Sequence, residues 1–139
     1  MAFEKTNFDI FQIGYKDSFT KQINEEDVQK FSELTGDVNP VHMNEEYAGT
    51  TRFKKRIAHG VISAGIISAL VGNKLMGVGS IYVSQELKFL APVFIGDTLT
   101  ASGEIVEKNE EKRRIKVKME VHNQDGKLVT EGYGIVMHE

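Results

Sequence analysis

The sequence predicts an α+β fold in which an antiparallel β-sheet wraps around one long central helix. Two observations favour this fold. The most apolar run, VISAGIISALVG, has helical length and no polar stripe, whereas from Gly79 onward the hydrophobic period changes to two. With 139 residues, 40% of them hydrophobic and 27% charged, the chain has the size and composition of one globular domain. We expect a single domain over residues 1–139.

The long helix is expected to begin after His59-Gly60 and to run to about Met76. Its apolar residues surround the cylinder, which is typical of a helix enclosed on nearly all sides. At 1.5 Å per residue it spans roughly 24 Å, a length that one curved sheet can wrap. Small residues such as Ser63, Gly65 and Ser68 allow close backbone approach.

A shorter helix precedes a loop. In INEEDVQKFSELTGD, Asn24 is a favourable N-cap, three acidic residues suit the positive end of the helix dipole, and Gly36 is a natural left-handed stop. Val28, Phe31 and Leu34 fall at helical spacing. This helix should deliver the chain directly into the loop DVNPVH.

The remaining segments are predicted to be strands. RRIKVKMEVHNQ alternates apolar with polar residues, the NQDGK turn follows, and KLVTEGYGIVMHE returns as the hairpin partner. In SIYVSQELKFLAPVFIG, Leu87, Phe89 and Ala91 are expected on one strand face, with Pro92 at its end. Further strands are expected at DTLTASGEIVEKN and near residues 15–23.

Composition argues against several classes of protein. A net charge of −3 argues against nucleic-acid binding, which needs a clustered basic face. The longest apolar run falls short of the ~20 residues of a membrane span, and the N-terminal residues lack the long apolar core of a signal peptide. Cysteine is absent, which suits a reducing interior. We therefore expect a cytoplasmic protein that binds neither nucleic acid nor membrane.

The loop GDVNPVHMN carries an acid and an imidazole five positions apart. Pro40 removes a backbone donor and biases Asn39 away from the α region, so the helix cannot continue from Asp37 to His42. A tight turn brings these two side chains close enough to contact one water. A carboxylate and an imidazole that share a water form an acid–base pair.

The segment His59-Gly60 offers a complement to this pair. Amides at a helix start are unpaired and carry positive potential, and Gly60 has no side chain to obstruct a carbonyl that approaches its N–H. An oxygen that gains negative charge would be stabilised there. These parts suit a reaction that passes through an enolate or oxyanion next to a thioester.

Each candidate residue also has an ordinary structural explanation. Asp37 is a common turn residue, His42 suits a surface loop, and His59 can simply pack at a helix end. Serines in the long helix act as spacers satisfied by i−4 carbonyls, or one of them orients a loop side chain. The basic runs are solvated faces, His122 lies on the wet face of its strand and His138 sits in the C-terminal tail. The combination favours the functional interpretation.

Two stretches, FSELTGDVNPVHMNEEYAGTTRFKKRIAHGVISAGIISALVG and GSIYVSQELKFLAPVFIGDTLTASGEI, strongly resemble the MaoC-like, (R)-specific enoyl-CoA hydratases. The resemblance covers nearly the whole chain beyond the first fifteen or so residues. It implies a hot-dog fold, a homodimer with active sites near the subunit interface, and syn addition of water to a trans-2-enoyl-CoA to give the (R)-3-hydroxyacyl-CoA. It implies no metal or organic cofactor.

The resemblance also implies residue roles. Asp37 and His42 resemble the catalytic dyad, and Gly60 resembles the backbone oxyanion donor. Four residues are expected to shape or orient the motif: Asn39, Pro40, His59 and Ser68. Arg56 stands where relatives often carry proline, which predicts a more mobile loop or contacts with CoA phosphates. Lys54 and Lys55 beside it are further candidates for phosphate contacts.

Other functions fit the same sequence. A dehydratase that acts on acyl-carrier-protein thioesters would use the same chemistry. A hot-dog thioesterase is less favoured, because such enzymes commonly carry an acid on the central helix and residues 61–76 contain none. A non-catalytic acyl-CoA-binding module would not need the acid–imidazole pair. Acyl chain length is left open, although short chains are expected.

Overall fold

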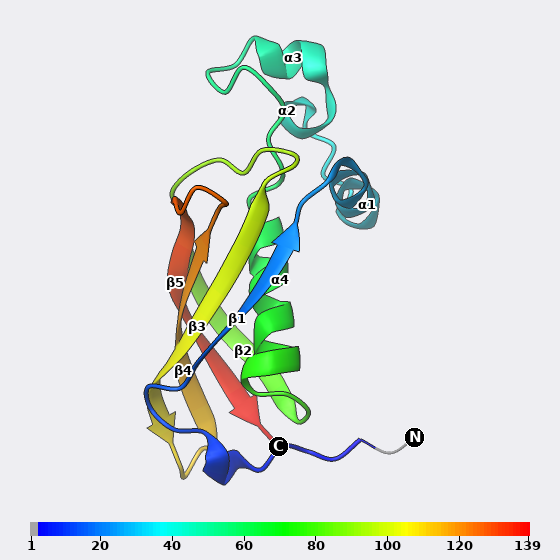
Figure 1. Ribbon diagram of the computed structural model, residues 1–139. Helices are drawn as coiled ribbons and strands as arrows, with labels where there is room; N and C mark the ends of the chain where they lie inside the picture. Colours follow the sequence, from blue (N-terminus) through cyan, green and yellow to red (C-terminus); the bar gives the residue numbers. More distant parts are fainter. Residues whose placement is uncertain (1–2) are drawn as a thin grey trace.

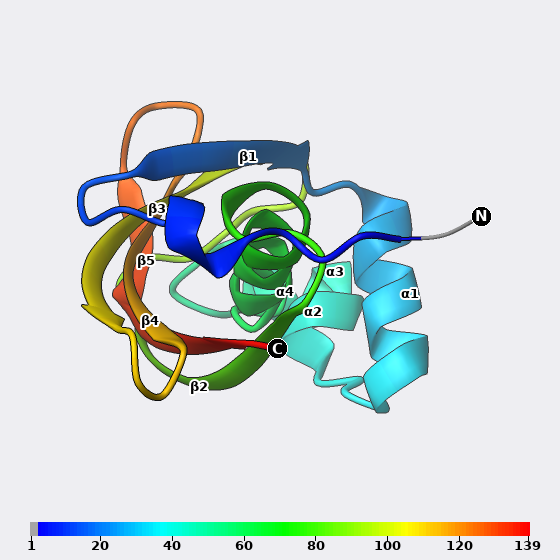
Figure 2. The ribbon, with the colours of Figure 1, turned by 90° about the horizontal axis from the view of Figure 1, so that it is seen from below.

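A computed structural model describes residues 3–139 as a five-stranded antiparallel sheet curved around the helix α4 (Ile62–Ala69) (Figures 1 and 2). The strands follow the order β1-β3-β4-β5-β2. Their bounds are β1 Lys16–Gln22, β2 Ser80–Phe89, β3 Thr98–Asn109, β4 Arg114–His122 and β5 Leu128–His138. Viewed along the helix in Figure 2, the sheet curves from β1 on one side of α4 to β2 on the other. The predicted α+β class is confirmed.

The central helix runs from α4 directly into a π-helical segment, η2 (Leu70–Leu75). The predicted helix therefore ends within about one residue of the expected place. Ile67 and Leu70 are fully buried against the concave face of the sheet, and Ile66 and Val71 are nearly so. Packing on the sheet supplies the stability that the small residues of this helix do not.

The sheet core follows the predicted alternation. In β4 the alternate residues Ile115, Val117, Met119 and Val121 have no exposed surface, while the residues between them face outward or lie half-buried. β4 pairs with β3 on one side and with β5 on the other, as the predicted hairpin requires. The turn into β5 contains Gly126 at φ 76°, a left-handed conformation that glycine adopts without strain.

The predicted face of β2 is partly wrong. The strand ends at Phe89, so Ala91 and Pro92 lie beyond it, and Phe89 is 51% exposed. The pairing register of β2 with β5 shifts between Tyr82 and Ser84. At the end of the strand, the ring of Phe89 lies against Gly60 instead of entering the core.

His138 also differs from expectation, because it is not in a solvated tail. It is the last residue of β5 and is 2% exposed. The rings of Phe8, the first residue of the short η1 helix (Phe8–Ile10), and of Phe11, its C-cap, pack against this imidazole with centroids 6.0 and 5.6 Å away. Arg113 donates to its Nδ1 at 3.2 Å, so this histidine closes one end of the barrel-like sheet.

Three short helices lie near the opposite end of the sheet (Figure 1): α1 (Glu25–Thr35), α2 (Pro40–Met43) and α3 (Glu45–Gly49). The predicted caps of α1 are confirmed. Asn24 and Asp27 form a capping box, and Gly36 ends the helix at φ 80°. Only part of its apolar stripe is buried, since Val28 is fully buried and Leu34 is 84% exposed. No helix in residues 3–139 is long and apolar enough to cross a membrane.

Candidate active site

The loop between α1 and α4 begins as the sequence predicts. Gly36 stops α1, and Pro40 occupies the first turn of a new helix, where its missing N–H costs nothing. Asn39 caps this helix by accepting a hydrogen bond from Val41 N–H at 3.1 Å. His42 consequently lies inside the one-turn helix α2, whereas an irregular turn was expected.

Asp37 and His42 lie side by side. One carboxylate oxygen of Asp37 and one ring nitrogen from each of His42 and His59 all lie within 4.8 Å of one another. The carboxylate is exposed, and its Oδ1 also accepts from Asn39 N–H at 3.3 Å, which fixes the turn. A water molecule placed between the carboxylate and the imidazole would contact both groups.

The hydrogen bond of His42 to the backbone determines its tautomer. Nδ1 lies 2.8 Å from the carbonyl oxygen of Ile57. Because a carbonyl only accepts, Nδ1 carries the proton and Nε2 keeps a free lone pair. Burial lowers the pKa of His42, and this outweighs the opposing effects of the Ile57 hydrogen bond and the Asp37 charge. His42 is therefore a neutral imidazole at neutral pH with Nε2 available as a base.

His59 holds the loop from inside. It is 2% exposed, and its Nε2 donates to the backbone carbonyl of Asp37 at 2.9 Å. Its ring stacks on His42 at 4.1 Å and 33°, and on Phe31 at 4.6 Å. The planes of His42 and His59 are tilted by 33°, and each ring uses one nitrogen for a hydrogen bond to a backbone carbonyl. This geometry suits an acid–base pair with a buried support.

His42 and Gly60 line one cleft of about 230 Å³. No acceptor in the described residues pairs with the N–H of Gly60, which directly precedes the first turn of α4. A Cβ at Gly60 would lie 3.4 Å from the ring of Phe89, a close van der Waals contact. Asp37 is exposed and does not line this cleft in the single chain.

The two serines of α4 differ from expectation. Ser68 is exposed, about two turns along the helix from Gly60, and does not line the cleft. Ser63 is 1% exposed, and its hydroxyl finds no partner in the described chain, so the expected bond to an i−4 carbonyl is absent. The face that carries Ser68 also exposes Val61 and Gly65 and is open in a single protomer.

The basic run 54–56 divides into two parts. Arg56 does not face solvent, because its Nε donates to the carbonyl of His42 at 2.6 Å and its Nη1 to Glu25 at 2.9 Å. Two of its guanidinium nitrogens are therefore bonded within the chain, and its predicted contact with CoA phosphates stays a prediction. Lys54 and Lys55 are exposed. Sequence reasoning missed Arg52, which lines the cleft with His42, because no local pattern distinguishes it from its basic neighbours.

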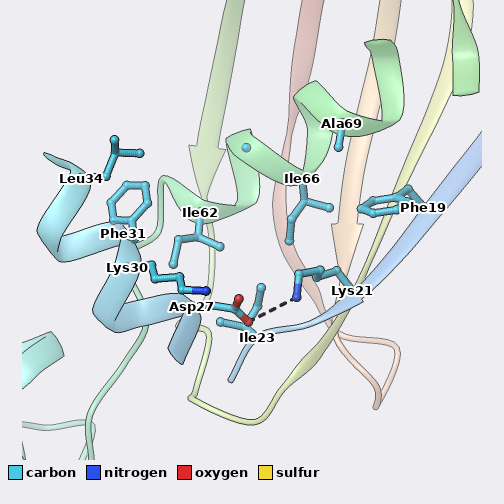
Figure 3. Close-up of a pocket in the computed structure, with 11 residues that line it drawn as sticks. Phe19, Lys21, Ile23, Asp27, Lys30, Phe31, Leu34, Ile62, Ile66 and Ala69 are labelled. Carbon is cyan, nitrogen blue, oxygen red and sulfur yellow. Dashed lines mark hydrogen bonds and ion pairs between the residues drawn. The ribbon is translucent and has the colours of Figure 1, made fainter. Parts of the chain in front are cut away.

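A second, more apolar pocket of about 420 Å³ lies between α1, β1 and α4 (Figure 3). Phe31, Ile62 and Ile66 line it, and the Lys21–Asp27 ion pair at 3.3 Å lies at its margin. It contains neither His42 nor Gly60. Phe31 lies between this pocket and the cluster of Asp37, His42 and His59, because the same ring packs on His59.

Comparison with known proteins decides the family. A model of the MaoC like domain matches residues 11–127, which is most of the chain. The chain belongs to the MaoC-like family. This MaoC-like protein is 47% identical to an (R)-specific enoyl-CoA hydratase of Rhodospirillum rubrum over 94% of its own length and 90% of the relative.

Two further relatives agree in sequence or structure. A 3-hydroxybutyryl-CoA dehydratase of Methylorubrum extorquens is 44% identical over 79% of the MaoC-like chain and 70% of the relative. The unliganded structure of R-hydratase PhaJ1 from Pseudomonas aeruginosa superposes with a TM-score of 0.91 at 41% identity. That superposition covers 96% of the present chain and 86% of the hydratase. The hot-dog fold expected from the sequence is thereby confirmed.

Proposed function

We propose that this MaoC-like protein is an (R)-specific enoyl-CoA hydratase that adds water to short trans-2-enoyl-CoA thioesters. One observation carries the proposal. A neutral imidazole with a free Nε2 lies beside a carboxylate and shares a cleft with an unpaired backbone N–H. Such an arrangement provides both groups that hydration of a conjugated thioester requires, a base for water and a donor for the carbonyl oxygen.

The dyad activates the water. His42 Nε2 takes a proton from a water that also hydrogen-bonds to the Asp37 carboxylate, and the resulting hydroxyl adds to C3 of the enoyl group. The bond from Nδ1 to Ile57 O fixes the tautomer that makes Nε2 basic. A positioned acid–base group of this kind contributes roughly 10²–10⁴ in rate.

The amide of Gly60 stabilises the other end of the reacting system. As the hydroxyl adds, negative charge moves through the conjugated system onto the thioester oxygen, and the Gly60 N–H donates to it. One such donor is typically worth about 2.7–4 kcal/mol in the transition state. The dyad then delivers the proton to C2 from the same face, so the balance is one water added in syn fashion.

The surrounding motif positions these groups. Asn39 and Pro40 start the helix that carries His42, and His59 fixes the backbone of Asp37. Lys54 and Lys55 are candidate contacts for CoA phosphates, because both are exposed close to the loop. Ser68 acts across a subunit interface, since its face of α4 is open in one chain.

The working unit we propose is a homodimer in the cytoplasm. β2 is an edge strand of the sheet, and it exposes Ile81 and Val83 by 42% and 43%. At its end Phe89 and Leu90 are about half exposed beside the cleft, and Val61, the N-cap of α4, is 56% exposed. A second copy placed along this edge would cover these apolar residues and complete the wall of the cleft.

The test is hydration of crotonyl-CoA, followed by the loss of absorbance of the conjugated thioester and by chiral analysis of the product. We expect turnover to (R)-3-hydroxybutyryl-CoA. No turnover over a panel of enoyl-CoAs from four to twelve carbons, or formation of the (S) product, would overturn the proposal.

Controls in the same assay separate the alternatives. Faster turnover of the acyl-carrier-protein thioester than of the CoA thioester would favour the dehydratase. Release of free thiol from acyl-CoA would favour a thioesterase. Tight binding of acyl-CoA with no product would favour a binding module.

A further inference from the structure

Arg56 is the least exposed cation of the basic run, with 13% of its side chain accessible. It lies between α1 and α2. Its Nε donates to the backbone carbonyl of His42 at 2.6 Å, and its Nη1 donates to the carboxylate of Glu25, in the first turn of α1, at 2.9 Å. The planar guanidinium makes both bonds at once in a fixed fork, which a lysine ammonium does not reproduce.

Arg56 belongs to a reciprocal set of bonds between two dipeptides. His42 Nδ1 donates to Ile57 O at 2.8 Å, Ile57 N–H donates to Val41 O at 3.2 Å, and Arg56 donates to His42 O. Residues 41–42 are thereby fixed to residues 56–57 by three hydrogen bonds. The ring of His42 is held by one of them and its backbone by another.

We propose that Arg56 is a positioning residue that, anchored by Glu25, holds the imidazole of His42 at the orientation needed for proton transfer. Arg56 does not line the cleft and therefore acts through His42 instead of contacting the substrate. The activity readout of this inference rests on the proposed hydratase function. A misplacement of about 1 Å at a reacting group can cost 10²-fold in rate, so a backbone clamp on a catalytic imidazole matters.

Arg56 also acts electrostatically. The charged or titratable groups near His42 are Asp37 from the preceding turn, His59 ahead of α4, Arg56 and, in the shared cleft, Arg52. Burial is the main cause that lowers the pKa of His42; the positive charge of Arg56 adds a smaller lowering effect, and Asp37 raises the pKa. Removing the guanidinium should therefore raise the pKa of His42, and replacing it by an ammonium should not.

The first test compares Arg56→Ala with Arg56→Lys. In Arg56→Ala we expect kcat for crotonyl-CoA to fall by about tenfold to a hundredfold with KM nearly unchanged, because the reacting group is displaced. The pKa of His42, followed by NMR through its ring protons, should rise. In Arg56→Lys that pKa should stay near the wild-type value while kcat stays low, which separates charge from geometry.

A matched pair on α1 provides the second test. Glu25→Gln weakens the anchor of Arg56, whereas Glu26→Gln removes an exposed ion pair with Lys30 one position further along the same helix. We expect only Glu25→Gln to lower kcat, and by less than Arg56→Ala. This pair stays informative if Arg56→Ala does not fold.

Wild-type kcat together with an unchanged pKa of His42 in Arg56→Ala would overturn the inference. Equal effects of Glu25→Gln and Glu26→Gln would also overturn it. If the wild type does not hydrate any enoyl-CoA, the proposed function fails, but the NMR titration still decides whether Arg56 controls His42. A slowly exchanging Nε–H of Arg56 in the wild type would support the clamp independently of turnover.

Discussion

In the curved sheet, Ile115, Val117 and Met119 are fully buried and are held by apolar packing. Between residues 36 and 60 only Ala48, Ala58 and His59 are buried, and hydrogen bonds to backbone carbonyls fix the segment. The two regions thus depend on different forces. Apolar packing gives stability over a large volume, whereas directed hydrogen bonds fix the orientation of a few side chains.

This difference implies that stability and activity reside in largely separate residues. A substitution in the sheet should lower the free energy of unfolding and leave the chemistry intact. A substitution of an exposed or half-buried residue in the loop should lower kcat and leave the free energy of unfolding nearly unchanged. The proposed hydratase can be tested by variants chosen from each region and from the boundary between them.

The largest effect is expected for Asp37→Asn. The amide oxygen can still accept from Asn39 N–H, so the turn should keep its shape. The negative charge beside His42 is lost, and we expect kcat for crotonyl-CoA to fall by roughly 10²–10⁴. Steady-state rates and the melting temperature measured on the same sample check this. If the melting temperature falls together with the rate, Asp37 stabilises the fold instead of acting in the chemistry.

In the core, Leu70→Ala should lower the free energy of unfolding by about 2–5 kcal/mol, because Leu70 is fully buried and a cavity would remain. The matched control is Leu34→Ala, the same chemical change at a residue that is 84% exposed, where about 0.5 kcal/mol or less is expected. Urea unfolding measures both. Folded Leu70→Ala should retain kcat near the wild-type value.

The sequence predicted the core better than the loop, for a physical reason. The alternation in β4 and the helix caps Asn24 and Gly36 are local patterns, because each depends only on residues close to it in the sequence. The bonds of Arg56 depend on how α1 and α2 are placed in three dimensions, and no spacing along the chain encodes them. His138 was assigned to a tail because the sequence around it does not show that Phe8 and Phe11 fold back over it.

The sequence indicated the candidate residues and some of the residues that support them, such as Asn39 and His59, but not the bonds that hold them in place. The motif from Asp37 to His42, together with Gly60, indicated an acid–base pair facing a helix start. The tautomer of His42 depends on Ile57 O, fifteen residues away in sequence, and therefore could not be predicted from the local sequence. The same holds for the stacking of His59 between Phe31 and His42.

His59 combines features of the buried core and of the hydrogen-bonded segment 36–60. It is buried, and it also holds the backbone of Asp37. We expect His59→Gln to lower the free energy of unfolding by about 1–3 kcal/mol, since the carbonyl of Asp37 loses its buried donor or the bond loses its geometry. kcat should fall as well, by less than in Asp37→Asn. A change in only one of the two quantities would assign His59 to one region alone.

The smallest effect concerns pH. Burial lowers the pKa of His42 below its ordinary 6.5, so kcat/KM should rise with pH through a pKa below 6.5 and reach a plateau by neutrality. The folded pKa lies below the unfolded one, so the stability that this neutral histidine contributes is present above pH 6.5 and is lost as pH falls through the folded value. A rate profile and pH-dependent melting measure both. An acid limb above pH 6.5 would contradict the assignment.

The most direct test of the separation between stability and chemistry is a paired measurement on His42→Gln, with kcat for crotonyl-CoA and the free energy of unfolding determined on one preparation. We predict that kcat falls at least a hundredfold, because a positioned base contributes roughly 10²–10⁴ in rate. The free energy of unfolding should change by no more than about 1 kcal/mol, as is usual for a single hydrogen bond. Wild-type turnover in this variant would contradict the account.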